Sequence, residues 1–258
     1  MKNMKKIVSV TLVVAMAAMM FAGCGSSSKK TSDTKSSEDT LIMATNAAFP
    51  PYEYVEGKDY KGIDVEIAQA IADKLGMKLE IKDVEFGSII GGVQSGKFDM
   101  GMAGITVTKD RQKSVAFSDP YATAIQSVIV KEGSSITSVD SVTKNTKIGV
   151  QQDTTGDIYA SDDYGDDAVV RYNKGADAVA ALVSGKVDCV IIDNEPAKAF
   201  VDANDGLQLL DSAYAEEEYA ICVAKDNDEL LGKINTALKS LKDDGTIDSI
   251  VSKYIVSK

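Results

Sequence analysis

The sequence predicts an α/β protein with mainly parallel sheets. Short apolar runs of strand length alternate along the chain with longer stretches whose apolar residues recur every three or four positions. One helix-to-strand corner also occurs twice, at 93–99 and again at 182–188. Alternation of strands and helices is typical of parallel sheets whose strands are joined by helical crossovers.

The expected elements follow one another from residue 41 onward. Strands are predicted at 41–44, 78–82, 98–102, 147–150 and 187–192, and helices at 64–75, 87–95, 156–161, 174–184 and 195–204. Isoleucines and a leucine recur every four residues in the first of these helices; Asp64 can cap it and Gly76 can end it. A C-terminal helix that Gly245 closes is lined by Leu230, Leu231, Ile234, Leu238 and Leu241.

The repeated corner predicts two lobes built from like βαβ units. Each copy reads as a helix end, a C-cap glycine, a lysine, an aspartate and then an apolar strand. The loops after the two strands, 103–106 and 193–195, are then equivalent. Ligands of open α/β sheets bind outside the carboxyl ends of the strands, so we expect both loops to face one cleft.

The composition excludes several kinds of chemistry. The chain of 258 residues has no histidine, which removes imidazole bases, Ser-His-Asp nucleophiles and histidine-ligated metals. Cys24, Cys189 and Cys222 are too few and too scattered for a disulfide framework, and we expect the last two to be buried free thiols on strands. The net charge of −11 argues against a nucleic-acid partner, because phosphate binding needs clustered Lys and Arg. No metal or cofactor is expected.

The first 40 residues are predicted to lie outside the fold. Three lysines precede an uncharged run at 7–21, which is shorter than the about 20 residues that span a bilayer. Residues 1–23 therefore read as a signal peptide. The end of this segment, Ala-Gly-Cys at 22–24, resembles the lipobox of bacterial lipoproteins, in which Cys24 carries the lipid. The alternative is a plain signal peptide with a chance cysteine. With the lipidated Cys24, residues 24–40 form a polar, serine-rich, disordered tether, which would hold the protein on the outer face of the cell membrane.

Two side chains suggest a binding site for a zwitterion. Arg111 follows a loop that contains Gly104, Thr106 and Thr108, and a guanidinium can grip a carboxylate with two hydrogen bonds. The alternative is a surface arginine paired with Asp110. Asp193 ends an apolar strand and needs a cation or several donors, and it serves either a ligand ammonium or the N-terminus of the next helix.

Residues 41–257 resemble the solute-binding proteins of polar amino-acid ABC transporters. The resemblance rests on eight ordered motifs: ATNAAFPPYEY at 44–54, GIDVEI at 62–67, DMGMAGITVTKDR at 99–111, FSDPY at 117–121, IGVQQDTTG at 148–156, VDCVIID at 187–193, YAI at 219–221 and LKDDGT at 241–246. It implies a two-lobed periplasmic-binding-protein-like fold, in which each lobe is a mainly parallel sheet flanked by helices. A hinge of two chain segments, near 120–124 and 217–220, would join lobe 1 (41–121 and 219–258) to lobe 2 (122–218).

The resemblance also implies a role for each site residue. Arg111, Thr106 and the Gly104 backbone would hold the ligand α-carboxylate, with Thr155 from the second lobe, and Asp193 would hold the α-ammonium. Phe49 and Phe86 match positions that hold the ligand side chain, although core packing is the other use of a phenylalanine. Two positions depart from the family pattern: Asn46 stands where aspartate is common, and Asp153 stands where glycine is usual. The other predicted ligand-binding residues are Ala103, Gln152 and Thr154.

The implied function is high-affinity capture of a polar L-amino acid outside the cell by a monomer that delivers it to the permease of an ABC importer, without catalysis. The two alternatives are an enzyme on the same fold, similar to cyclohexadienyl dehydratase, and a tethered amino-acid sensor domain. The enzyme would need a proton donor, for which Glu85, Asp153 and Glu195 are candidates. The ligand side chain stays open: Asn46 suggests glutamine or cystine, and the acidic residues leave arginine and lysine open.

Overall fold

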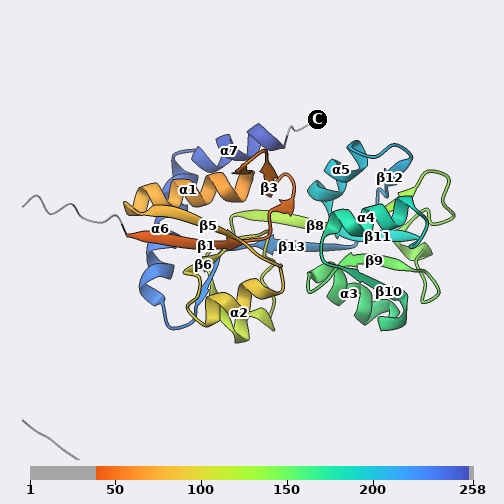
Figure 1. Cartoon of the computed structure of the whole chain (residues 1–258), viewed down its shortest axis with the longest axis horizontal. Helices are drawn as coiled ribbons and strands as arrows, with labels where there is room; N and C mark the ends of the chain where they lie inside the picture. The colour runs from red at the N-terminus through yellow and green to blue at the C-terminus, as the bar shows by residue number, and fades with distance from the viewer. Residues whose placement is uncertain (1–38, 256–258) are drawn as a thin grey trace, which may run out of the picture. The chain divides into compact units, whose positions relative to one another are not determined.

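The structure is a computed structural model that describes residues 39–255. The predicted signal peptide, Cys24 and most of the tether lie outside the described residues. Within 39–255 the chain forms two large sheets with helices on both faces and one small sheet. The two large sheets and the elements around them are called lobe 1 and lobe 2 below (Figure 1). None of the helices in this range combines the length and the apolar character needed to cross a membrane.

Lobe 1 is built on a five-stranded sheet in the order β5-β1-β6-β14-β7. Its strands are β1 (Thr40–Thr45), β5 (Lys78–Asp83), β6 (Met100–Gly101), β7 (Val115–Phe117) and β14 (Cys222–Ala224). Its helices are α1 (Ile63–Leu75), α2 (Ser88–Gln94), α6 (Asp228–Asp243) and α7 (Thr246–Tyr254). Figure 1 shows α1 and α2 on opposite faces of this sheet. A small antiparallel sheet precedes α1 and consists of β2 (Ala48–Phe49), β3 (Glu53–Glu56) and β4 (Asp59–Lys61).

Lobe 2 is built on a six-stranded sheet in which β10-β9-β11-β8-β12 form one path and β13 pairs with β8. Its strands are β8 (Ala122–Lys131), β9 (Ile148–Gln151), β10 (Val169–Tyr172), β11 (Cys189–Asp193), β12 (Leu207–Leu209) and β13 (Ala215–Tyr219). Its helices are α3 (Thr155–Tyr164), α4 (Gly175–Val183) and α5 (Asn194–Asp202).

Strand β11 shows why this lobe buries its apolar residues on both faces of the sheet. Successive side chains of a strand point to opposite faces. Val190 and Ile192 belong to the same core cluster as Ala178 of α4, whereas Cys189 and Ile191 cluster with Ala160 of α3. A continuous apolar run such as 189–192 therefore marks a strand with a helix on each side.

The repeated corner forms the same structure in both lobes, which confirms the prediction of like units. Gly96 and Gly185 both adopt φ +73°, a left-handed conformation that favours glycine. The two aspartates make equivalent bonds: Oδ2 of Asp99 accepts from the N–H of Ile42 at 2.7 Å, and Oδ2 of Asp188 accepts from the N–H of Lys147 at 2.8 Å. Each corner thus fixes the start of the neighbouring parallel strand.

The expectation of mainly parallel sheets is wrong in part, because each sheet is mixed. β1, β5 and β6 are parallel, as are β9, β10 and β11, but β14 runs antiparallel to β6 and β7, and β8 runs antiparallel to β11, β12 and β13. Parallel pairing needs a crossover of a dozen or more residues. The connections from β7 to β8 and from β13 to β14 are short chain crossings between the sheets, so these strands are not joined by helices.

The chain passes between the two sheets twice. β7 belongs to lobe 1 and the next strand, β8, to lobe 2; β13 belongs to lobe 2 and β14 to lobe 1. The crossing segments lie side by side, since β8 and β13 pair from Ala122–Tyr219 to Gln126–Ala215 (Figure 1). An isolated bridge between Thr106 and Tyr219 links the second crossing to the loop after β6.

Several elements differ from the sequence-based expectation. The N-cap of α1 is Gly62 and Asp64 makes no cap bond, because its side chain turns inward, as described below. The expected strand 98–102 is only Met100–Gly101. Gly76 ends α1 in the left-handed conformation, as predicted. The free thiols of Cys189 on β11 and Cys222 on β14 are buried, which confirms that prediction too.

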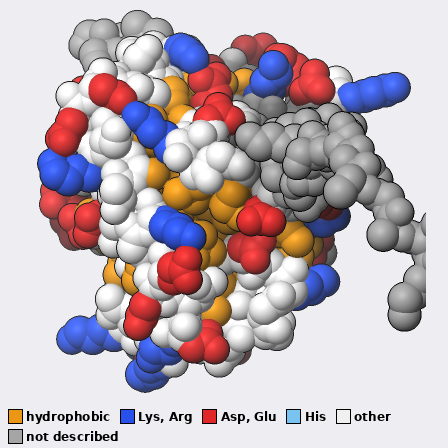
Figure 2. All heavy atoms as spheres, turned by 90° about the vertical axis from the view of Figure 1, so that its left-hand side faces the viewer, with side chains coloured by type: hydrophobic (Ala, Val, Ile, Leu, Met, Phe, Trp, Pro, Cys, Tyr) orange, Lys and Arg blue, Asp and Glu red, His pale blue; other side chains and the backbone are white. Residues whose placement is uncertain are grey.

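The acidic side chains on the surface are interspersed with basic ones. On the face shown in Figure 2, acidic and basic side chains alternate, with hydrophobic side chains between them. Helix α6 alone carries the pairs Lys233–Glu229 at 2.6 Å and Lys239–Asp243 at 2.8 Å, and its neighbour Asp244 pairs with Lys74 of α1 at 3.1 Å. Exposed pairs of this kind add little stability, so the fold rests on its apolar clusters.

Candidate functional site

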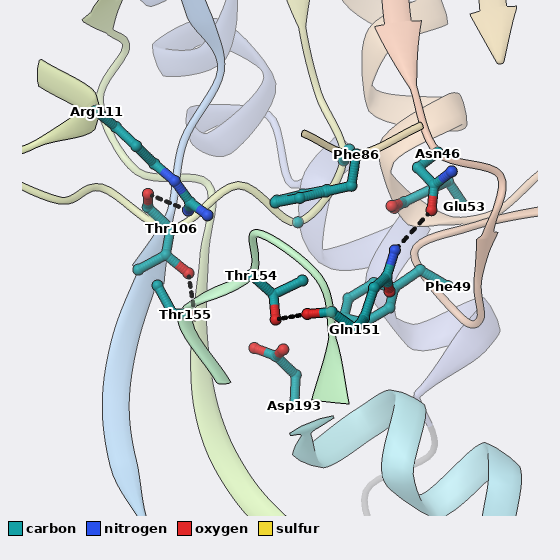
Figure 3. Close-up of a pocket in the computed structure, with 12 residues that line it drawn as sticks. Asn46, Phe49, Glu53, Phe86, Thr106, Arg111, Gln151, Thr154, Thr155 and Asp193 are labelled. Carbon is teal, nitrogen blue, oxygen red and sulfur yellow. Dashed lines mark hydrogen bonds between the residues drawn. The ribbon is translucent and has the colours of Figure 1, made fainter. Parts of the chain in front are cut away.

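A small cavity lies between the carboxyl ends of the strands of the two lobes. Lobe 1 lines it with Asn46, Phe49, Glu53, Phe86, Ala103, Gly104, Thr106 and Arg111, and lobe 2 with Gln151, Thr154, Thr155 and Asp193 (Figure 3). The structure therefore brings together all of the predicted site residues except Gln152, whose side chain is exposed. Glu53 and Gln151 line the cavity although the sequence analysis assigned them no role.

Arg111 is buried at one end of this cavity. It lies on a short 3₁₀ turn, Arg111–Lys113, and only 8% of it is exposed. Its Nη1 donates to the carbonyl of Thr106 at 2.9 Å, and its Nη2 donates to the carbonyl of Asp153 in lobe 2 at 3.1 Å. The Phe86 ring lies 5.3 Å from the centre of the guanidinium. Burial lowers the pKa of Arg111, which nonetheless remains a cation at neutral pH.

The alternative for Arg111, a surface residue paired with Asp110, is wrong. Asp110 pairs with Lys113 at 2.5 Å, and both of these side chains are exposed. The guanidinium instead bonds to backbone carbonyls of both lobes, and no carboxylate of residues 39–255 is bonded to it. Such a group can accept a ligand carboxylate without first breaking an ion pair.

Hydroxyl groups from both lobes surround the place where a carboxylate would meet Arg111. Oγ1 of Thr106 lies 3.5 Å from Oγ1 of Thr155, across the lobes. Thr106 also donates to Oε2 of Glu217 on β13 at 3.1 Å. The side chain of Thr154 caps α3 by accepting from the N–H of Asp157, so Thr155 lies in the first helical turn, where N–H groups have no partner within the helix.

The expectation for the Gly104 backbone needs correction. Its N–H donates to Oδ2 of Asp64 at 2.8 Å and is not directed at the cavity. Gly104 adopts φ +54°, and a β-carbon there would lie 3.0 Å from the Phe49 ring. Its role in the site is therefore to let the loop approach Phe49 closely, which only glycine allows in this conformation.

Asp193 ends β11 and is 7% exposed. It occupies the N-cap position of α5, but its side chain makes no cap bond. Its Oδ1 accepts from the hydroxyl of Tyr219 at 2.5 Å. Burial, and then the nearby charge of Glu217, raise the pKa of Asp193 to about 7. Of the two uses that the sequence left open, the helix-cap bond is not made, and the carboxyl group lines the cavity instead.

The opposite end of the cavity holds an amide pair and a carboxyl group. Nε2 of Gln151 donates to Oδ1 of Asn46 at 2.9 Å, which links lobe 2 to lobe 1, and Nδ2 of Asn46 donates to the carbonyl of Val84 at 2.7 Å. Glu53 on β3 is fully buried, and neither of its carboxyl oxygens has an N–H or O–H donor among residues 39–255. Burial first, and then the neighbouring Asp64, raise the pKa of Glu53 well above its usual range.

The acids proposed as proton donors for an enzyme lie outside the cavity. Glu85 is exposed, and Glu195 pairs with Lys198 at 2.6 Å. The carboxylate of Asp153 lies in an adjacent groove, against Gly87. Across 39–255, no three His, Cys, Asp or Glu side chains are arranged to hold a metal ion. The cavity thus offers a cation, two carboxyl groups and hydroxyls, which is a set suited to binding a small charged molecule.

Comparison with known proteins agrees with this geometry. The model of the bacterial extracellular solute-binding proteins, family 3, matches residues 41–257. The arginine-binding extracellular protein ArtP of Bacillus subtilis is 34% identical over 96% of this chain and 97% of its own length. The glutamine-binding ABC transporter protein GlnH of the same organism is 33% identical over 98% of both chains.

A solved structure shares the fold as well. An ancestral arginine-binding protein bound to arginine superposes with a TM-score of 0.80 at 40% identity, over 84% of this chain and 99% of that one. The match to the family model covers both lobes and all the residues that line the cavity. The chain therefore belongs to the bacterial extracellular solute-binding proteins of family 3, and its fold is that of the amino-acid-binding proteins that serve ABC transporters.

Proposed function

We propose that this protein captures an L-amino acid with a cationic side chain, of which arginine is the first candidate, and delivers it to an ABC importer. The observation that carries the choice of side chain is Glu53, which is fully buried at the cavity wall and receives no hydrogen bond at either oxygen from the described part of the chain. A buried carboxylate without a partner is strongly unfavourable. A guanidinium or ammonium on the ligand would supply the missing partner.

The charges of the cavity support the same choice. A zwitterionic amino acid uses one cation and one anion, and Arg111 and Asp193 provide them. Glu53 is then a second acid, and once it is ionised the backbone of the ligand does not compensate its charge. Figure 3 shows Arg111 and Glu53 at opposite ends of the group of lining side chains, so an extended ligand can meet both.

The remaining lining residues fit the shape of such a ligand. Phe49 and Phe86 present aromatic rings between the two ends, and a planar guanidinium stacks well on a ring. Asn46 and Gln151 add amide groups beside Glu53. Relatives that bind arginine support this assignment.

Glutamine is the second candidate ligand. The relative GlnH binds glutamine, and the amide pair of Asn46 and Gln151 can exchange hydrogen bonds with a ligand amide. A neutral ligand would require Glu53 to stay protonated.

Calorimetry with arginine, lysine, citrulline and glutamine would test the proposal. Arginine is expected to bind most tightly, and Glu53→Gln is expected to weaken arginine by roughly 30-fold or more while leaving glutamine within a few-fold, since a buried charge pair is worth about 2–5 kcal/mol. Glu85→Gln is the matched control, because that acid is exposed and outside the cavity. Binding of glutamine with no measurable binding of arginine would exclude the cationic assignment.

Three further points belong to the proposal. The protein acts without catalysis, as a monomer, and is held at the outer face of the cell membrane by a lipid on Cys24. The order of a basic start, a short apolar run and Ala-Gly-Cys at 22–24 supports the anchor. Cells that express Cys24→Ser should release the protein into the medium, whereas retention in the membrane fraction would contradict the anchor. Recovery of unchanged arginine after prolonged incubation checks the absence of turnover.

A further inference from the structure

Glu53 has a second carboxyl group behind it. Asp64, the second residue of α1, is also fully buried, and its carboxyl group lies within hydrogen-bonding reach of Glu53. Oδ2 of Asp64 accepts from the N–H of Gly104 at 2.8 Å and from the hydroxyl of Tyr121 at 2.8 Å. Oδ1 of Asp64 and both oxygens of Glu53 have no N–H or O–H donor within 39–255. Asp64 itself does not line the cavity.

Within residues 39–255, no Lys or Arg side chain is bonded to this pair. The titratable groups that face it from the elements packed around it are acids and phenols: Tyr52 beside β3, Asp83 on β5, Tyr121 before β8 and Asp193 on β11. Two adjacent carboxylates in such a place cannot both be ionised without a cation. Either a proton shared by the two groups or a ligand cation placed against Glu53 must therefore compensate the pair. In agreement, burial raises the pKa of Asp64 to about 7.

We propose that Asp64, without touching the ligand, sets the side-chain selectivity of the site through a proton that it shares with Glu53. With the proton held, the pair presents an O–H donor and accepts a neutral amide or ureido side chain. With the proton gone, the pair presents an anion and accepts a guanidinium. This inference rests on the proposed function, because it assumes that the ligand side chain reaches Glu53.

Competition between the proton and the guanidinium predicts the direction in which arginine binding changes with pH. A cation stabilises the ionised pair, so its binding must become tighter as the pH rises and the proton is lost. Citrulline has the size of arginine but an uncharged end, and it gains nothing from ionisation of the pair. Both ligands share the same α-carboxylate and α-ammonium, so protons taken up or lost at Asp193 cancel in the ratio of the two dissociation constants.

The decisive measurement is calorimetry of arginine and citrulline with the whole protein between pH 5.5 and 8.5. The preference for arginine over citrulline is expected to rise with pH, by up to tenfold per unit where the pair titrates, and then to level off. Arginine binding with a preference that does not change with pH would overturn the inference and leave the proposed function intact. Absence of arginine binding at every pH would instead refute the proposed function itself.

The variant Asp64→Asn tests whether Asp64 acts on the ligand through Glu53. The amide oxygen can still accept from Gly104 and Tyr121, and the amide N–H₂ gives Glu53 a permanent donor in place of the shared proton. The preference for arginine should then be nearly independent of pH and should persist at pH 5.5. Glu85→Gln, which removes an exposed acid outside the cavity, should leave the rise of the arginine preference with pH as it is in the unchanged protein. If the preference of Asp64→Asn for arginine over citrulline still rose with pH, the inference would be overturned.

A second measurement covers the case in which Asp64→Asn does not fold. Titration of the unchanged protein at pH 6.5 in two buffers of different ionisation enthalpy counts the protons released on binding. Arginine is expected to release more protons than citrulline, and the difference should come close to one. Equal release by both ligands would contradict a shared proton at this pair.

Discussion

Gly87 of lobe 1 lies directly against the carboxylate of Asp153 of lobe 2. A β-carbon placed on Gly87 would overlap Oδ2 of Asp153. Asp153 itself holds a left-handed backbone conformation, φ +65°, and its carbonyl accepts from Nη2 of Arg111. One residue of lobe 2 thus touches two residues of lobe 1 at the rim of the cavity.

This contact predicts that Gly87→Ala weakens ligand binding without lowering stability. Gly87 has φ −62° and ψ −15°, which alanine adopts freely, so lobe 1 alone should tolerate the change. The overlap between the added methyl group and the Asp153 carboxylate then costs about 1 kcal/mol of binding free energy, or roughly fivefold in affinity. Asp153→Gly should restore binding in the double variant, because it removes the overlapping carboxylate. Equal affinities of Gly87→Ala and the unchanged protein by calorimetry would show that the carboxylate simply moves aside.

Arg111→Ala is predicted to abolish measurable amino-acid binding while the protein stays folded. Loss of one partner of a desolvated charge pair costs about 2–5 kcal/mol or more. Arg111→Lys should also bind poorly, because an ammonium cannot reproduce the two bonds of the guanidinium to Thr106 and Asp153. Arg171→Ala is the control: this arginine pairs with Asp157 and Asp166 outside the cavity. Near-native affinity of Arg111→Ala would refute the carboxylate site.

The stability of the free protein should fall as the pH rises from about 4 to about 7. Burial raises the pKa of Asp193 to about 7, from an unfolded value near 3.8, so in this window the folded state binds more protons than the unfolded state. The stability associated with protonated Asp193 is complete below pH 3.8 and is lost as the pH passes through 7. Thermal unfolding at pH 5 and pH 8 measures the effect, and Asp193→Asn should reduce the difference. An unchanged difference in that variant would assign the effect to other groups.

Binding should close the two lobes around the ligand. The residues expected to bind the ligand carboxylate, Arg111 and Thr106, lie on lobe 1. The residue expected to bind the ligand ammonium, Asp193, lies on lobe 2. Since neither lobe satisfies both ends of a zwitterion, the ligand has a higher affinity for the closed arrangement and shifts the population toward it. Small-angle scattering should show a smaller radius of gyration with ligand, and Asp193→Ala should lose most of that change. An unchanged radius of gyration at saturating ligand would contradict the division of the binding residues between the two lobes.

Periodic sequence patterns predicted the helices of the described chain except α7, whereas the orientation of single side chains depended on tertiary contacts. Ile67 and Ile71 face the core at four-residue spacing, and α1 follows from that spacing almost to the residue. Asp64 looked like a helix cap because aspartate often is one. Its inward orientation depends on Gly104 and Tyr121, which are 40 and 57 residues away, and no local pattern contains that information.

Three positions at the site, Gln151, Gln152 and Glu53, differ from the sequence-based expectation for a related reason. Gln151 lines the cavity and Gln152 does not, because neighbouring residues at a strand end point to opposite sides, and a shift of one position reverses the assignment. Glu53 sits in a three-stranded sheet with strands of two to four residues, too short for alternation to separate inward from outward positions. Arg111 and Asp193 were predictable because each follows a clear strand or loop and carries a charge that the local chain does not neutralise.

The pairing of β8 with β13 makes the two connections between the lobes a single ribbon. Sliding one strand past the other would break backbone hydrogen bonds from Ala122–Tyr219 to Gln126–Ala215, whereas bending the ribbon keeps them. The motion available to the chain is then close to one mechanical coordinate, and Tyr219 couples that coordinate to the site through its hydroxyl on Asp193. A pair of dyes, one on each lobe, would read occupancy as one distance, so the scaffold is suited to serve as an optical reporter of its ligand.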